Sequence, residues 1–220
     1  MELTLPTAID QQQALRYLGM QHGADAMTQQ LLNQAERELL TVARPRAVTV
    51  FAECSALAEY CTGQDIQKHL VGCDGCILLG CTLGAGVDTA SRVACAKDMA
   101  YAVVLDAIAS VLAEEMAEQA EQILRRQVQE KGRFLTGRFS PGYGDWPIAV
   151  QNELIRLLDA PRKIGLCATP SHLMVPRKSI TAILGVANHP VTGQRAGCAH
   201  CTLRDKCNYR KEGKTCGNDI

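Results

Sequence analysis

The stretch RFSPGYGDWP, residues 138–147, says more about this chain than any other ten residues of the sequence. It holds an arginine, a tyrosine, an aspartate and the only tryptophan. Two prolines stiffen the backbone and two glycines permit positive φ angles, so the stretch predicts a loop of fixed shape. Aromatic residues are only 4% of the chain, and we expect their concentration here to serve something other than core packing. A shaped loop with one cation and aromatic faces suits a small charged ligand, although a structural turn before the next helix explains the same residues.

This stretch resembles the signature of the activation domain of vitamin B12-dependent methionine synthase. The family pattern is Arg-x-x-Pro-Gly-Tyr-x-x-x-Pro, and its positions are filled here by Arg138, Pro141, Gly142, Tyr143 and Pro147. A second family pattern, Ser-x-x-Met-x-Pro-x-x-Ser, is matched within residues 171–179, in the same order and at a similar separation. Two patterns in register are far more specific than one, and on this basis the chain is identified as a member of the family.

The resemblance implies a reaction. In methionine synthase the cobalamin cofactor is occasionally oxidised to inactive cob(II)alamin, and the activation domain uses S-adenosylmethionine and reduction to restore methylcobalamin. For this chain the resemblance implies that Arg138 grips S-adenosylmethionine and that Ser140 contributes its backbone. Tyr143 is the expected catalytic residue, because the family tyrosine lies close to the ligand and the corrin. The remaining expected ligand-binding residues of the loop are Pro141, Gly142 and Asp145.

The chain departs from the family in its acidic residues. A family acid six positions before the arginine is replaced by Gly132, and an ungapped comparison places another on Ser110 rather than on Glu114. After the tyrosine, Gly-Asp-Trp replaces the family's Pro-Ala-Cys, so Asp145 is our candidate for a compensating carboxylate.

Length, charge and cysteine usage bound the class of protein. The chain has 220 residues, enough for one substantial core, and its 23 basic residues balance 23 acidic ones. This balance offers no electrostatic case for nucleic acid or an anionic membrane. We find no secretory signal and no apolar run that approaches a membrane span. Eleven cysteines, an odd number, favour a reducing cytosol over a disulfide framework, so we expect a cytoplasmic protein.

The sequence predicts the α+β class, with mixed helices around a small, twisted, mainly antiparallel sheet and a cysteine-rich C-terminal tail. We expect residues 1–190 to form the activation-like domain, with a helical N-terminal part at 1–45, and residues 191–220 to form the tail. Strands are predicted at 47–51, 76–82, 162–167 and 179–187, and helices within 8–44, starting with a capping box at Asp10 and Gln13, and at 148–159.

Residues 87–131 contain neither glycine nor proline. A single helix of that length would span roughly 65 Å, whereas a domain of this size has a diameter of about 45 Å. The segment is therefore predicted to bend, to break or to project towards a partner. Glu114, Glu115 and Glu118 lie on its successive turns, and we interpret them as a solvated face.

The tail contains four cysteines in the spacing C-x2-C-x5-C-x8-C, namely Cys198, Cys201, Cys207 and Cys216. Four thiolates can hold zinc or an iron–sulfur cluster, and a metal would stabilise a segment that has few apolar residues. We favour the iron–sulfur cluster because the implied chemistry needs a one-electron reduction. Zinc and a tail without metal stay open.

The sequence shows no homocysteine or folate barrel and no cobalamin-binding Asp-x-His-x-x-Gly motif. We therefore expect a standalone domain that reactivates a separate corrinoid methyltransferase in trans, with an electron donor such as flavodoxin or ferredoxin. The alternatives are a non-catalytic, metal-stabilised module that docks on a corrinoid protein, and a regulator that binds S-adenosylmethionine.

Overall fold

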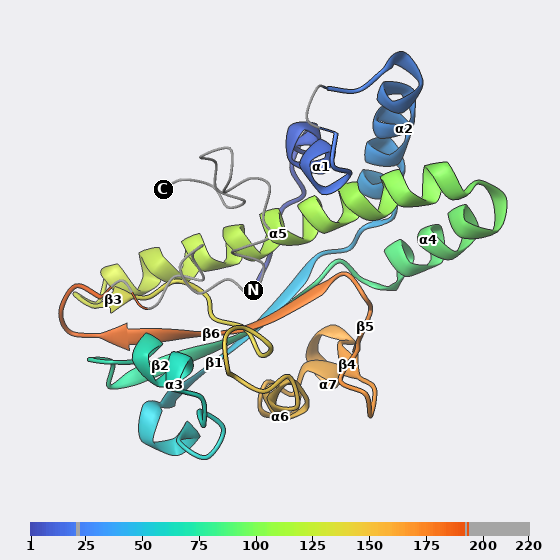
Figure 1. Cartoon of the computed structure of the whole chain (residues 1–220). Helices are drawn as coiled ribbons and strands as arrows, with labels where there is room; N and C mark the ends of the chain where they lie inside the picture. The colour runs from blue at the N-terminus through green and yellow to red at the C-terminus, as the bar shows by residue number, and fades with distance from the viewer. Residues whose placement is uncertain (21–22, 192, 194–220) are drawn as a thin grey trace.

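The computed structural model describes residues 1–20, 23–191 and 193. Its main sheet is antiparallel, with the order β1-β2-β6-β3 (Figure 1). The strands are β1 (Arg46–Glu53), β2 (Gly75–Thr82), β3 (Phe134–Leu135) and β6 (Ser179–Ala187), and a separate two-stranded ribbon consists of β4 (Cys167–Ala168) and β5 (Met174–Val175). The α+β class with a small antiparallel sheet is confirmed.

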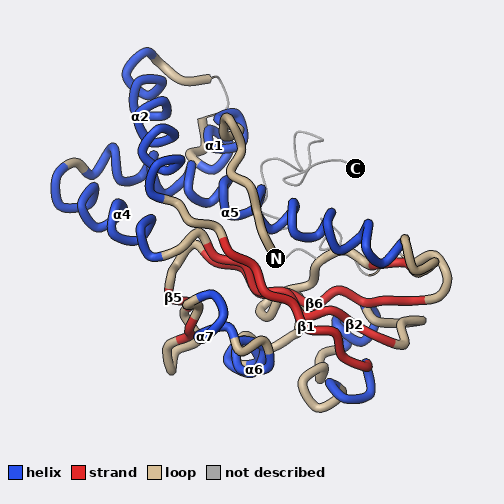
Figure 2. Tube along the Cα trace, turned by 180° about the vertical axis from the view of Figure 1, so that it is seen from behind, coloured by secondary structure: helices blue, strands red, loops and turns tan. Residues whose placement is uncertain are grey.

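Helices cover both faces of this sheet. The long helix α5 crosses one face, and the short helices α3, α6 and α7 lie on the other (Figures 1 and 2). The helices are α1 (Gln11–Tyr17), α2 (Ala26–Val42), α3 (Gln64–His69), α4 (Ala85–Lys97), α5 (Met99–Gln129), α6 (Val150–Leu157) and α7 (Ala160–Ile164), with a 3-10 turn at Cys54–Leu57. One apolar cluster lies between the sheet and α5, and a second lies below the sheet, on the face covered by α3, α6 and α7. Every residue of β2 is buried, which explains why its sequence is apolar without alternation.

The helical segment at 87–131 is broken, one of the outcomes that the sequence allows. Asp98 adopts extended backbone angles (φ −154°, ψ 108°) and separates α4 from α5. Its side chain accepts hydrogen bonds from the amides of Ala100 and Tyr101, at 2.9 and 3.2 Å, and so caps α5. The 31 residues of α5 then span about 46 Å, which matches the domain diameter.

Most predicted elements are confirmed, and one is wrong. Asp10 caps α1 by accepting a hydrogen bond from the amide of Gln13 at 3.0 Å. Of the strand predicted at 162–167, residues 162–164 are instead the end of α7 and only Cys167 belongs to a strand, β4, because Pro161 suits the first turn of a helix and Gly165 ends it with φ 72°. Among the described helices none has the length and apolar character of a membrane span.

Candidate functional site

The stretch at 138–147 begins on the sheet and then turns away from it. Phe139 and Ile183 of β6 exchange two backbone hydrogen bonds, at 2.9 and 2.8 Å. Beyond them, the amide of Gly142 donates to the carbonyl of Trp146 at 2.9 Å, and the amide of Tyr143 donates to that of Ser140 at 3.1 Å. Gly142 has φ 90°, a conformation that favours glycine. The predicted loop of fixed shape is confirmed.

Two aromatic residues of this loop are core residues, so our expectation that their concentration serves something other than packing is wrong for them. Phe139 and Trp146 are buried in the cluster below the sheet, and the indole nitrogen of Trp146 donates to the carbonyl of Tyr60 at 2.7 Å. Tyr143 differs, because it is exposed and meets Phe139 edge to face at 6.0 Å between ring centroids. Of the three rings, Tyr143 is the one that a ligand can reach.

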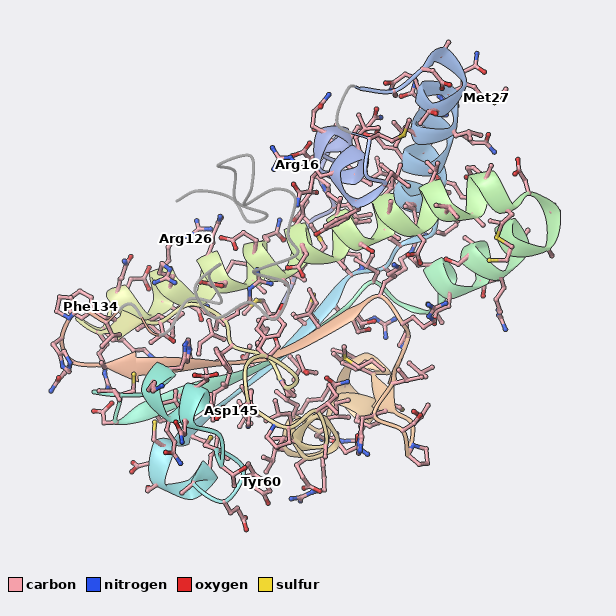
Figure 3. The ribbon with its side chains drawn as sticks, viewed as in Figure 1. Arg16, Met27, Tyr60, Arg126, Phe134 and Asp145 are labelled. Atoms are coloured by element: carbon pink, nitrogen blue, oxygen red, sulfur yellow. The ribbon has the colours of Figure 1, made fainter. Side chains whose placement is uncertain are left out.

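Asp145 lies against α3 (Figure 3). Its carboxylate accepts hydrogen bonds from the amides of Gln64 at 2.7 Å and Asp65 at 3.0 Å, the first residues of that helix. The hydrogen bond from Asp65, with that from Gln64, holds the pKa of Asp145 below its ordinary value. Both oxygens therefore serve as a helix cap, and that role competes with the predicted contact to a ligand.

Arg138 lies among three glutamates of α5. Its Nε donates to Glu121 at 3.0 Å, and its terminal nitrogens lie 3.3 Å from Glu114 and 3.5 Å from Glu118. The Glu121 side chain is 11% exposed, whereas those of Glu114 and Glu118 are 50% and 40% exposed. Arg138 is thus fixed from below by a buried partner and has two looser partners on the solvent side.

Glu114 and Glu118 are solvated as the sequence predicts, and both also pair with Arg138, so the interpretation as a solvated face is incomplete. Glu121 escaped our sequence reading, although its spacing of seven and three residues from the other two places it on the same helix face. It also binds Arg125 at 2.7 Å, and Arg125 in turn donates to the carbonyl of Leu135 at 2.6 Å. These contacts hold the start of the loop against α5.

The second sequence pattern reaches the same side of α5. Lys178 pairs with Asp106 at 2.8 Å and donates to the hydroxyl of Ser110 at 2.8 Å, one turn before Glu114. The hydroxyl of Ser179 donates to Thr82 of β2 at 2.8 Å. One polar stripe of α5 thus contacts both patterns, Lys178 at its start and Arg138 further along.

The chain matches the family described as vitamin B12 dependent methionine synthase, activation domain, over residues 34–192. It belongs to this family. The match begins on α2, well before the two sequence patterns, and ends at the point where the described chain ends.

Comparison with a solved structure supports the same fold for this chain. The reactivation domain of MetH, solved bound to AdoHcy, superposes with a TM-score of 0.59 at 15% sequence identity, over 94% of this chain and 82% of that one. No curated protein sequence matches the chain significantly.

Within this family member, Tyr143 stands beside the ion cluster. Tyr143 is 44% exposed, and the burial of the rest of the residue raises its pKa; Glu114 raises the pKa further, and Arg138 opposes the shift. The phenol therefore stays neutral at physiological pH, which suits a positioning surface better than a base. The predicted metal ligands Cys198, Cys201, Cys207 and Cys216 lie outside the described residues, and no group of three or more candidate metal ligands occurs within the part that is described.

Proposed function

We propose that this chain binds S-adenosylmethionine between the RFSPGY loop and α5 and presents its methyl group to the cobalamin of a separate corrinoid methyltransferase. An electron donor such as flavodoxin or ferredoxin reduces cob(II)alamin by one electron, and the resulting cob(I)alamin takes the methyl group in trans, which gives methylcobalamin and releases S-adenosylhomocysteine. The observation that carries the proposal is the Arg138 cluster beside the exposed Tyr143, in a chain of the activation family. The proposal makes the protein a methyltransferase component that is active only with its corrinoid partner.

The charges of the cluster fit those of the ligand. S-adenosylmethionine carries a carboxylate, an amino group and a sulfonium, with one net positive charge when the amino group is protonated. Around the loop, Arg125 and Arg138 face Glu114, Glu118 and Glu121, which leaves one net negative charge. This chain lacks the family carboxylates at Gly132 and Ser110, and the three glutamates of α5 take their place in this proposal.

The exposed fractions of the three glutamate side chains suggest which ion pairs of Arg138 open when the ligand binds. The buried Glu121 keeps its hold on Nε of Arg138, while the two terminal nitrogens release the half-exposed Glu114 and Glu118 and take the ligand carboxylate in a bidentate pair. The released glutamates then face the amino group and the sulfonium, and the ring of Tyr143 offers a further surface to the cation. Because the sulfonium is already a good leaving group, these residues need only position the methyl group.

The test is calorimetric titration with S-adenosylmethionine under anaerobic conditions. We expect saturable binding by the wild type and a loss of at least about tenfold in affinity, roughly 1.4 kcal/mol, in Arg138→Ala. Arg138→Lys keeps the charge without the bidentate geometry and should lose affinity too. Arg162→Ala is the matched control, since that arginine is exposed on α7 and its one ion-pair partner among the described residues is Asp159. Unchanged affinity in both Arg138 variants contradicts the proposed site.

Methyl transfer separates the proposed function from the alternative. With a labelled methyl donor, a reductant such as flavodoxin or ferredoxin and a partner loaded with cob(II)alamin, the proposal expects label on the cobalamin. Binding without transfer indicates the non-catalytic docking module instead.

We further propose that Cys198, Cys201, Cys207 and Cys216 hold an iron–sulfur cluster, or zinc, that stabilises the tail. One observation supports a role near the ligand: Gly193 lies against His69 and Thr136, since a Cβ on it would sit 2.7 Å from the His69 ring. That ring lies 5.0 Å from Phe139, which contacts Tyr143. Iron and zinc analysis with an anaerobic absorption spectrum is the test, and a colourless protein with stoichiometric zinc leaves only the structural role.

A further inference from the structure

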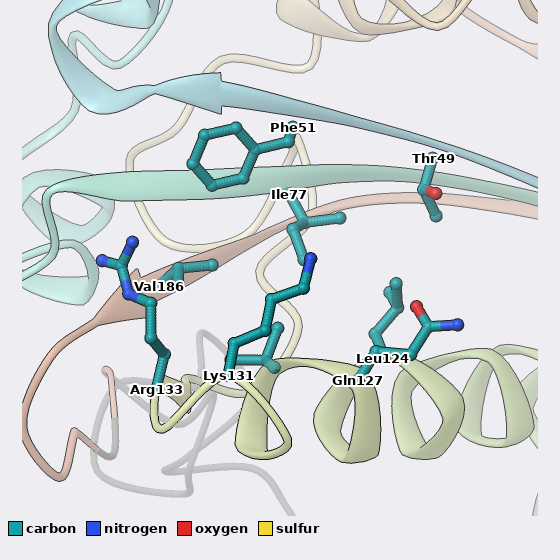
Figure 4. Close-up of a pocket in the computed structure, with 9 residues that line it drawn as sticks. Thr49, Phe51, Ile77, Leu124, Gln127, Lys131, Arg133 and Val186 are labelled. Carbon is teal, nitrogen blue, oxygen red and sulfur yellow. The ribbon is translucent and has the colours of Figure 1, made fainter.

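A cavity of about 360 Å³ lies between the sheet and the end of α5, and Thr49 and Phe51 of the edge strand β1 line one side of it (Figure 4). Apolar side chains from both layers form its walls, namely Phe51, Ile77, Leu124, Val128 and Val186. Its volume lies within the range of about 300–1,000 Å³ that ligand pockets occupy. None of its lining residues belongs to the Arg138 cluster.

Two cations, Lys131 and Arg133, line the same cavity. Arg133 forms an ion pair with Asp74, and its Nε is buried without a hydrogen-bond partner in the part of the chain that is described. Lys131 forms no ion pair with any described residue and reaches from the helix end towards the sheet, beside Ile77 (Figure 4). A buried donor without an acceptor is rare in native proteins and calls for one.

The aromatic wall of the cavity is exposed. Phe51 is 58% exposed, and its ring lies over Gly75 of β2, where an added Cβ would stand 2.6 Å from the ring carbon Cζ. The bare backbone of Gly75 therefore lets the ring lie flat across the sheet. An exposed ring at the side of an apolar cavity gains stability when an apolar group covers it.

We propose that this cavity binds a small amphipathic carboxylate. The apolar body of the ligand lies between Phe51 and the end of α5, and its carboxylate pairs with Lys131 and accepts a hydrogen bond from the Nε of Arg133. An anion is favoured because Lys131 and Arg133 outnumber Asp74, the one acidic partner that either has in the described part of the chain. The site shares no residue with the proposed S-adenosylmethionine site.

Three probes with one tail and different head groups test the proposal: octanoate, octanol and octylamine, each titrated into the full-length protein and followed by NMR. We expect octanoate to bind about tenfold more tightly than octanol, as one charge-assisted hydrogen bond allows, and octylamine to bind most weakly. Lys131→Gln should reduce the affinity for octanoate to that for octanol and leave octanol unchanged. Lys97→Gln is the matched control, since Lys97 also lies in the last turn of a helix, α4, and is exposed.

Thr49→Trp provides a second variant, because Thr49 lines the cavity from the edge strand and a large ring there fills it. We expect this variant to lose octanoate binding while its melting temperature shows that it folds. Several results overturn the proposal: no octanoate binding by the wild type, equal binding of octanoate and octylamine, an unaltered preference in Lys131→Gln, or undiminished binding in a folded Thr49→Trp.

Discussion

Two sites beside α5 present opposite charge to solvent. At the 138–147 loop, two arginines face three glutamates, and the buried Glu121 anchors the cluster. Just beyond the end of α5, at the cavity that reaches across to β1, Lys131 and Arg133 face one acidic partner among the described residues, Asp74, whose side chain is 64% exposed. The first arrangement has one net negative charge and the second one net positive charge.

The difference shows what positions each set of charges. Arg138 is held by contacts between segments far apart in the sequence, and these contacts leave it little freedom. Lys131 has no ion-pair partner among the described residues and lies just beyond the end of α5, beside apolar walls. The site around Arg138 is therefore suited to recognise a ligand by geometry, and the site around Lys131 to recognise one by apolar area with a single charge.

The largest expected difference between the two sites is in their contribution to stability. Glu121→Gln removes the buried partner of two arginines, so the free energy of unfolding should fall by about 3 kcal/mol. Asp74→Asn removes an exposed partner of Arg133 and should cost less than about 1 kcal/mol. Urea unfolding of both variants checks the contrast. Equal losses contradict it, because they show that the Arg138 cluster is no better shielded from solvent than a surface pair.

Sequence reading recovers those strands of the fold whose residues face a core on both sides. Residues 76–82 and 179–187 form apolar runs that only buried strands of this length accommodate, and both are found. Residues 162–167 mislead, because Ile164 and Leu166 pack into the same core from a helix end and the chain beyond it. Alternating burial is thus not sufficient for a strand when a proline precedes it.

The candidate site is recovered in part. The motif identifies Arg138 and Tyr143 because local chain geometry and family pattern coincide there. It cannot identify Glu121, whose contact with Arg138 depends on how α5 packs against the loop 17 residues later. Asp145 shows the converse, since a carboxylate placed in the motif has its two oxygens on the first turn of α3, 80 residues earlier in the chain.

A variant of Asp145 tests whether this carboxylate acts together with the glutamates around Arg138 or only caps α3. The hydrogen bond from the Asp65 amide lowers its pKa below the ordinary 3.8, so its contribution to stability is present above that pH and is lost as the pH falls through the folded value. Asp145→Asn should therefore lower stability at neutral pH, by less than Glu121→Gln, and flatten its dependence on pH below about 4. Urea unfolding at several pH values measures both. Reduced affinity for S-adenosylmethionine at unchanged stability supports a ligand contact instead.

The smallest effect concerns the charge of the ligand itself. S-adenosylmethionine and S-adenosylhomocysteine differ by one methyl group and one positive charge. The ratio of their affinities therefore measures the electrostatic field of the glutamates around Arg138. Because Glu118 is half-exposed, we expect Glu118→Gln to reduce this ratio by about threefold, through weaker binding of the sulfonium alone, and added salt to reduce it in the wild type. Glu130→Gln, at the exposed end of α5, should leave the ratio unchanged. Calorimetry with both ligands decides, and an equal loss for the two means that Glu118 binds the amino group they share.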